Sequence, residues 1–456
     1  MTDADQKAAI RERMASTGEN YTTAKRAIER ARLKAQSEQL DSTLAEQRTR
    51  TLNERFDTVA GQLGSDKPPA VRLAGVYAMA GLADDWQDHR QMCVDVLCAY
   101  LRMPYEPEPG DDAPVEKRLV FQASREVRHT VIRVIAAHLN GTAPVSWCGL
   151  NFDFAGAVFD GGDFSDAKFS GGTVNFVGAE FSGGTVNFAG AEFSGGVINF
   201  AGARFSGAGV NFFLAKFSGA KVNFAGAKFS GGTYGFGYAE FSGQTVNFTG
   251  AKFSGAEVHF SRSKFTGESP KFTGADTSGG MVFFHAAEFA GGTVSFSRAE
   301  FASETVDFAG AEFSGGTVNF AGARFSGARV NFFLAKFSGA RVNFAGAKFS
   351  GGTVGFGYAE FSGGTVSFSR AEFSTETVDF TGAEFAGGTV GFADAEFPGG
   401  TVGFAGAGFA GGTVDFSRVA SWTHPPDFGS GFDMSHPPAG VMPPTATSPS
   451  PDRPVP

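Results

Sequence analysis

The sequence has little cysteine, tryptophan or tyrosine. Its three cysteines, Cys93, Cys98 and Cys148, are too few for a disulfide framework. Only 3 Trp and 7 Tyr stand beside 52 Phe and 64 Gly, so one residue type supplies most of the aromatic content. Ordinary protein cores draw on Leu, Ile, Val and Phe together. The bias therefore predicts one structural position that is repeated many times.

Long apolar runs are also missing. No stretch is long enough to span a membrane, and the first residues, MTDADQKAAIRERM, contain no apolar signal segment. The formal net charge of -9 is mild for 456 residues and disfavours non-specific binding to nucleic acid. From this we expect a cytoplasmic protein that does not contact membranes and does not bind DNA.

Residues 1–50 are rich in alanine and in charges of both signs, which predicts an exposed helix or a loose coiled coil. Five basic side chains fall within ten residues: Lys25, Arg26, Arg30, Arg32 and Lys34. The cluster fits a solvated helix face, and it also fits a contact with nucleic acid or a partner protein.

Residues 51–145 show the periodicity of amphipathic helices. Apolar residues recur at steps of three and four in RTLNERFDTVAGQL, VRLAGVYAMAGLA, HRQMCVDVLCAYLR and SREVRHTVIRVIAAHL. The stretch GSDKPPAVRLAGVYAMAGLADD resembles a HEAT-type helical repeat, with a proline turn that leads into a helix. Residues 104–117, PYEPEPGDDAPVEK, are expected to form a loop between helices.

From about residue 150 the sequence becomes strictly periodic. Every twelfth position from 176 to 416 is Phe, at 21 of 21 sites. A companion column from 181 to 409 has Phe at 19 of 20 sites, and the exception is Thr277. The spacing alternates between five and seven residues without interruption, which is the signature of a solenoid.

Units such as AEFSG place a small residue two positions before the Phe and a glycine two positions after it. This pattern resembles the pentapeptide-repeat family over residues 150–420, with two extra residues in every second pentamer. The resemblance implies a right-handed, four-sided β-helix with the Phe and the small residue pointing inward. The fold class we expect is thus multidomain α plus β, in which an N-terminal α-helical domain precedes a right-handed β-helix solenoid.

The length of one coil follows from charges on the outer surface. The residues before the companion Phe, from Lys168 to Glu396, would stack on their neighbours one coil away. A 12-residue coil would create 12 like-charge pairs and 7 opposite pairs, whereas a 24-residue coil creates 7 like and 11 opposite pairs. Opposite charges on adjacent strands stabilise a sheet slightly. We therefore expect about 24 residues per coil.

Residues 199–243 recur almost unchanged at 319–363, an offset of 120 residues or five such coils. Between the two blocks, Pro270 occupies an inward small-residue position and Thr277 replaces a core Phe, so we expect a local weak point. Residues 421–456 contain ten of the 19 prolines and are expected to form a C-terminal cap and a disordered tail. Trp422, Phe428, Phe432 and Met434 are the expected plug.

The sequence predicts neither an enzyme nor a cofactor site. His89 and Cys93 share one side of a predicted helix, but Cys98 lies about 140° around it, so a metal site would lack ligands. Core cysteines beside a partly exposed histidine are the simpler interpretation. The glycines recur with the repeat and form no phosphate-binding loop.

Six outward residues break the repeat and form the candidate interaction surface: Phe213, Leu214, Tyr238, Phe333, Leu334 and Tyr358. In a 24-residue coil they form two apolar patches five coils apart, which suit a partner protein or a second copy of the chain. The alternative is local corner packing that the duplication copied.

Two functions from different classes remain open. The first is a non-enzymatic protein-interaction scaffold with an unknown protein partner. The second rests on the family, some of whose members mimic DNA with an acidic surface and inhibit or protect DNA gyrase. Residues 357–416 carry one basic and eight acidic side chains (1 − 8 = −7), a confined acidic segment. A flat threonine array for ice binding is disfavoured, because no Thr-x-Thr pair recurs.

Overall fold

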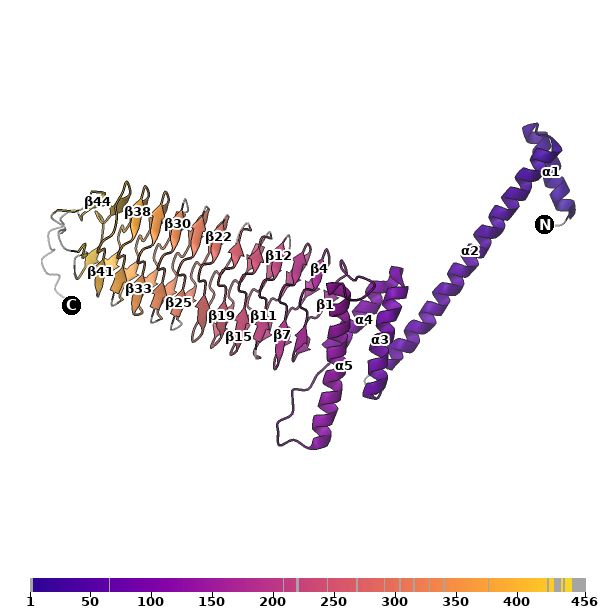
Figure 1. The fold of residues 1–456 in the computed structure, drawn as a ribbon, viewed down its shortest axis with the longest axis horizontal. Coiled ribbons are helices and arrows are strands. Elements are labelled where there is room, and N and C mark those ends of the chain that lie inside the picture. Colours follow the sequence, from indigo (N-terminus) through magenta and orange to yellow (C-terminus); the bar gives the residue numbers. More distant parts are fainter. Residues whose placement is uncertain are drawn as a thin grey trace, which may run out of the picture. The chain divides into compact units, whose positions relative to one another are not determined.

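The computed structural model describes residues 3–444 apart from 65, 208, 219, 220, 244, 268, 269, 291, 303, 304, 315, 328, 339, 340, 376, 425, 430–435 and 438. The chain divides into two compact units, residues 1–93 and 94–456. Among the described residues, five α-helices and one 3-10 helix precede a series of short parallel strands (Figure 1). None of these helices is long and apolar enough to cross a membrane.

The first unit contains α1 (Asp3–Thr17), α2 (Tyr21–Gln62), α3 (Pro69–Asp85) and η1 (Gln87–His89). The side chain of Asn20 caps α2 by accepting a hydrogen bond of 3.0 Å from the backbone N–H of Thr23. No glycine or proline follows until Gly61, so one helix crosses the boundary that composition places at residue 50. The change in composition marks where α2 becomes buried, because Leu52, Val59 and Leu63 pack in the core while residues 31–51 are exposed.

The helices expected after residue 64 are confirmed. They are α3, α4 (Arg90–Arg102) and α5 (Val115–Asn140). Helix α5 begins directly after Pro114 and ends at Gly141, whose φ of 82° is the left-handed conformation common after helices. The proline-rich segment between α4 and α5 is a loop.

The solenoid begins with one turn of four strands: β1 (Phe152–Asp153), β2 (Val158–Phe159), β3 (Gly162–Asp163) and β4 (Lys168–Ser170). Phe169 pairs with Phe193, and Lys216 pairs with Glu240, each 24 residues further along the chain. The 24-residue coil is therefore confirmed. The solenoid has four sides, and successive strands along the chain lie on successive sides.

One side is an eleven-stranded parallel sheet, whose strands appear along the lower edge of the solenoid in Figure 1. Its strands in order are β3, β7 (Thr185–Asn187), β11 (Gly209–Asn211), β15 (Thr233–Gly235), β19 (Glu257–His259), β21 (Met281–Phe283), β25 (Thr305–Asp307), β29 (Arg329–Asn331), β33 (Thr353–Gly355), β37 (Thr377–Asp379) and β41 (Thr401–Gly403). We call its outer surface the aromatic face.

The core consists of stacked phenylalanine rings. Phe200 and Phe224 lie 4.6 Å apart with parallel planes, while Phe200 and Phe212 on opposite sides meet edge to face at 5.9 Å. Each buried Phe contributes about 2–3 kcal/mol of transfer free energy. Valine and alanine columns, for example Val222 and Ala227, fill the remaining interior.

Asparagine ladders run along two opposite sides of the solenoid. The Oδ1 atom of Asn211 accepts a hydrogen bond from the N–H of Phe213, two residues on, which stabilises the corner. Its Nδ2 atom donates to Asn187, one coil away, at 3.2 Å. Asn223 makes the same contact with Asn199 at 3.1 Å. Where Asn precedes the first-column Phe, its side chain therefore stabilises both the corner and the coil spacing.

Pro270 and Thr277 are both buried, and the sheets are interrupted where they lie. The side opposite the aromatic face splits into a five-stranded sheet ending at β17 (Thr245–Asn247) and a seven-stranded sheet starting at β23 (Thr293–Ser295). A third side splits after β18 (Lys252–Ser254) and resumes at β24 (Glu300–Phe301). Among the described residues of the gap, isolated bridges at Lys271 and Asp276 are the only pairings on these two sides. The interruption lies where the sequence predicts a weak point.

The coils continue past residue 420. β43 (Ser421–Trp422) pairs with β40 (Glu396–Phe397), and β44 (Val441–Met442) pairs with β42 (Thr413–Asp415). The ring of Phe428 stacks on Phe404 at 5.3 Å, and Trp422 packs on Phe416 at 5.8 Å. Phe432, Met434 and the tail from residue 445 lie outside the described residues.

Candidate functional site

The aromatic face gathers the exposed aromatic residues of the described solenoid. Phe213 and Tyr238 contact each other edge to face at 5.5 Å, as do Phe333 and Tyr358 at 5.7 Å. In the first patch, Phe213 is 43% exposed, Leu214 51% and Tyr238 41%. In the second, Phe333 is 43% exposed, Leu334 51% and Tyr358 55%. The structure thus brings each set of three residues predicted from sequence into one patch, and both patches lie on the same face.

Four of the six residues have a strained backbone. Leu214, Tyr238, Leu334 and Tyr358 have φ of 59°, 56°, 59° and 54°, in the left-handed region that other coils fill mainly with glycine. A side chain with a Cβ costs roughly 1–2 kcal/mol there. Large apolar side chains are unusual at such exposed positions, because the left-handed conformation favours glycine.

Sequence reasoning missed a third group between the two patches. His259 stacks on Phe283 at 4.8 Å, and the guanidinium of Arg262 lies over the Tyr238 ring, 5.4 Å from its centroid. Met281 is exposed beside them. The sequence carries a signal for this group, because His259 and Phe283 are the two aromatic rings in a column that otherwise holds Asn, Asp or Gly on this face.

A groove borders the second patch. It has a volume of about 370 Å³ and lies along strands β29, β33 and β37. Gly355 interrupts the side-chain ladder between Asn331 and Asp379, which opens the hollow next to Phe333. Polar atoms at its rim and aromatic carbon in its wall suit the side chains of a protein surface.

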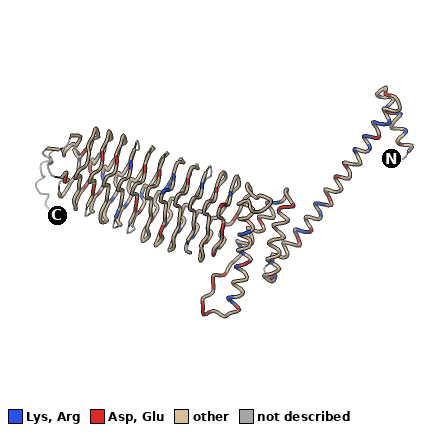
Figure 2. Tube along the Cα trace, in the orientation of Figure 1, with Lys and Arg blue, Asp and Glu red and all other residues tan. Residues whose placement is uncertain are grey.

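The two flanking sides carry charge in nearly every coil (Figure 2). Lys168, Glu192, Lys216, Glu240 and Lys264 pair in register along the ten-stranded side, and Lys216 lies 3.4 Å from Glu192. On the ten-stranded side the sign alternates from Lys168 to Glu288. Other neighbours on the flanking sides are of like sign, for example Arg204 with Lys228 and Glu288 with Glu312. Like acidic pairs occur in the last coils, at Glu360 with Glu384 and at Glu372 with Glu396.

A partly buried polar cluster joins α5 to the first coil. Asp160 accepts hydrogen bonds from Tyr105 Oη at 2.7 Å and interacts with His129 Nε2 at 2.9 Å, while Arg125 lies 3.1 Å away. Burial opposes ionisation of Asp160, but the hydrogen bonds and the charges of His129 and Arg125 outweigh it and lower its pKa. Burial, with the Asp160 carboxylate, raises the pKa of Tyr105. Arg128 donates to the carbonyl oxygens of Leu101 and Val158. The cluster thus ties α5 and the loop before it to the first coil.

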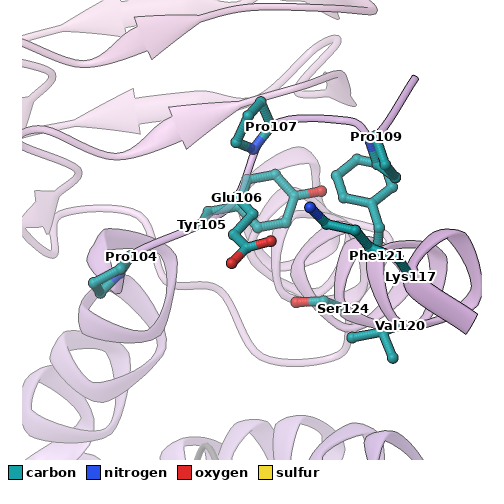
Figure 3. Close-up of a pocket in the computed structure, with 9 residues that line it drawn as sticks. All are labelled: Pro104, Tyr105, Glu106, Pro107, Pro109, Lys117, Val120, Phe121 and Ser124. Atoms are coloured by element: carbon teal, nitrogen blue, oxygen red, sulfur yellow. The ribbon is translucent and has the colours of Figure 1, made fainter. Parts of the chain in front are cut away.

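A small hollow of about 170 Å³ lies between the proline-rich loop and α5 (Figure 3). Tyr105 stacks on Phe121 at 5.6 Å across its wall, and Lys117 and Val120 contribute the α5 side. Tyr105 also bonds Asp160, so this hollow belongs to the anchor of the loop.

The metal site considered at His89 and Cys93 has another explanation. The His89 ring stacks on Trp86 at 4.3 Å, and Cys93 is fully buried. Burial raises the pKa of Cys93 to about 11 and that of Cys98 to about 12, so both are unreactive thiols. Among the residues that the structure describes, no three His, Cys, Asp or Glu side chains gather as metal ligands would.

The comparisons with known proteins bear on the solenoid. Residues 154–198 match the family model described as pentapeptide repeats (9 copies), and no curated protein matches this chain. The structure of trypsin-treated QnrB1, a plasmid-mediated fluoroquinolone resistance protein, is 19% identical over 40% of this chain and 85% of that chain, with a TM-score of 0.20. The family match thus identifies pentapeptide repeats in residues 154–198, and the phenylalanine columns, the corner glycines and the four-sided coil continue the same architecture along the β-solenoid that follows the α-helices.

Proposed function

We propose that this chain is a non-enzymatic scaffold whose solenoid docks a protein on the aromatic face. The observation that carries the proposal is the pair of exposed aromatic patches at strained corners, which local packing does not require. The two patches repeat at an offset of 120 residues, so the face offers two similar sites on one support. The N-terminal helices would cap the solenoid or bind a second protein.

The scaffold is tested with four substitutions in the full chain: Phe213→Ser, Tyr238→Ser, Phe333→Ser and Tyr358→Ser. Val177→Ser and Val197→Ser on the opposite side are the matched control, because both residues are partly exposed valines outside the aromatic face. Photo-cross-linking in cell extract, followed by mass spectrometry, identifies bound proteins. We expect the quadruple variant to lose a partner that the control keeps. Identical partner sets for both variants would refute the docking face.

A second candidate is protection or inhibition of a topoisomerase by DNA mimicry. The acidic pairs Glu360 with Glu384 and Glu372 with Glu396 favour it in the last coils. The columns before them carry both signs, including basic pairs such as Lys228 with Lys252, and lack the continuous negative stripe that mimicry of a duplex requires. A gyrase supercoiling assay with micromolar protein decides between the functions, and we expect no effect. Cytoplasmic location remains a prediction.

A further inference from the structure

The aromatic face is symmetric about its central strand. In the order of its eleven strands, β21 is the sixth, with five strands on each side. The patch on β11 and β15 lies three and two strands before β21, and the patch on β33 and β29 lies three and two strands after it. A half-turn about an axis along β21 would therefore bring the first patch of one copy onto the second patch of another.

This half-turn matches large side chains with glycines. It brings Phe213, which follows β11, opposite Gly357 of a second copy, and it brings Phe333 opposite Gly237. In the ladder column it brings Asn211 opposite Gly355, and in the corner column Leu214 opposite Tyr358. The same four matches recur with the two copies exchanged. Such mutual fit between a surface and itself is the requirement for a two-fold interface.

The charges agree with the same arrangement. His259 on β19 would face Asp307 on β25, and Asn187 on β7 would face Asp379 on β37. Arg262, at the corner after β19, would face Gly310. At the axis Phe283 and Met281 would each meet their own copies. No like charges oppose each other in these matches, although the flanking sides carry charge in nearly every coil.

We propose that the aromatic face binds a second copy of this chain, with the two solenoids antiparallel and strand β21 against strand β21. The proposal rests on the proposed function and names the partner for that face. Eleven strands at about 4.8 Å and a breadth of about 10 Å give about 500 Å² per copy. The total of about 1,000 Å² meets the lower limit for a specific interface.

Other arrangements fit less well. If the two solenoids ran parallel, each strand would meet its own copy in reversed direction, and Phe213 would face the edge that carries Gly209 instead of Gly357. The opposite side of the solenoid has no exposed Phe or Tyr among its described residues. Of these arrangements, the antiparallel one places Phe213 opposite Gly357 and Phe333 opposite Gly237.

The first experiment measures self-association of the full chain by sedimentation equilibrium over a range of concentrations. Phe283→Arg brings two positive charges together at the axis, and we expect the dissociation constant to rise more than about tenfold. Val197→Arg on the opposite side is the matched control and should leave it unchanged. Circular dichroism verifies that both variants are folded. A monomeric parent chain, or equal effects of both substitutions, overturns the proposal.

The second experiment tests the arrangement with a short bis-maleimide cross-linker in a Cys148→Ser background. His285→Cys, beside the axis, should cross-link to itself. Leu214→Cys should cross-link only when mixed with Tyr358→Cys. Cross-linking of Leu214→Cys to itself, or none at position 285, overturns the antiparallel dimer. If the chain is monomeric while the quadruple serine variant still loses a different protein, the dimer is refuted and the docking function stands.

Discussion

At the scale of single residues, Thr277 is the one departure from Phe in the companion column of the core. It lies in the phenylalanine column between Phe253 and Phe301 with 2% exposure, and its hydroxyl donates a hydrogen bond to the carbonyl of Glu300 at 3.3 Å. In the coils around it, rings seven residues apart meet edge to face: Phe265 with Phe272 at 6.2 Å, Phe289 with Phe296 at 6.1 Å and Phe301 with Phe308 at 6.4 Å.

We expect Thr277→Phe to raise the thermal midpoint, because a Phe there would stack on Phe253 and Phe301. Burial of the ring contributes up to about 2–3 kcal/mol, reduced by loss of the hydroxyl contact. Thr249→Phe, at an exposed corner, is the control and should not stabilise. A melt followed by circular dichroism measures both. An unchanged or lower midpoint for Thr277→Phe would show that the column cannot accept the ring.

The strained corners give a second prediction at this scale. Leu214→Gly and Leu334→Gly remove the left-handed strain at φ of 59°, so the thermal midpoint should stay level or rise. The same variants should weaken association, since each removes an exposed apolar side chain from the aromatic face. Phe213→Gly is the control, because Phe213 is not in the left-handed region and should lose stability. A fall of several degrees for Leu214→Gly would mean that the corner residues serve folding.

At the scale of elements, the junction between α5 and β2 depends on one carboxylate. The lowered pKa of Asp160 means that the folded state stabilises its ionised carboxylate over the protonated form. The stability it contributes is therefore present above the pKa of an unfolded aspartate, about 3.9, and is lost as pH falls through its lower folded value.

Asp160→Asn should lower the free energy of unfolding at neutral pH by roughly 1–3 kcal/mol, because the charged hydrogen bonds are lost. The difference between variant and parent should shrink as pH falls below the ordinary aspartate range. Urea denaturation, followed by the helical signal at neutral and acidic pH, measures it. Asp166→Asn, an exposed neighbour, is the control. A constant difference at both pH values would exclude the charge as the cause.

At the scale of the whole molecule, the sequence predicts those features of the solenoid that follow from its repeat, namely the coil length and the strand register. The coil length followed from outward charges, and the strand register of Lys216 with Glu240 confirms it. The Asp160 cluster could not be predicted, because it joins residues far apart in the chain and no period links them. The last coils were missed for another reason. Phe428 keeps the 24-residue step from Phe404, but Trp422 follows Phe397 by 25 residues, so insertions hide the register.

The repeat also predicts the outcome of deletions between the patches. Removing residues 287–310 deletes one whole coil and leaves both patches on the aromatic face. Removing residues 287–298 deletes half a coil. Because the phenylalanine columns repeat every 12 residues, the core continues, but every later residue moves to the opposite side of the solenoid. We expect both deletions to fold, because each repeat contacts only its neighbours.

Sedimentation equilibrium should then separate the two deletions. The whole-coil deletion should still dimerise. Without β25, the two-fold axis lies between β19 and β21, and Phe213 of one copy still lies opposite Gly357 of the other. The half-coil deletion should be monomeric, because its two patches face away from each other. Matched circular dichroism spectra would establish that both are folded. A dimer formed equally well by the half-coil deletion would show that self-association does not need both patches on one face, and would place the contact elsewhere in the chain.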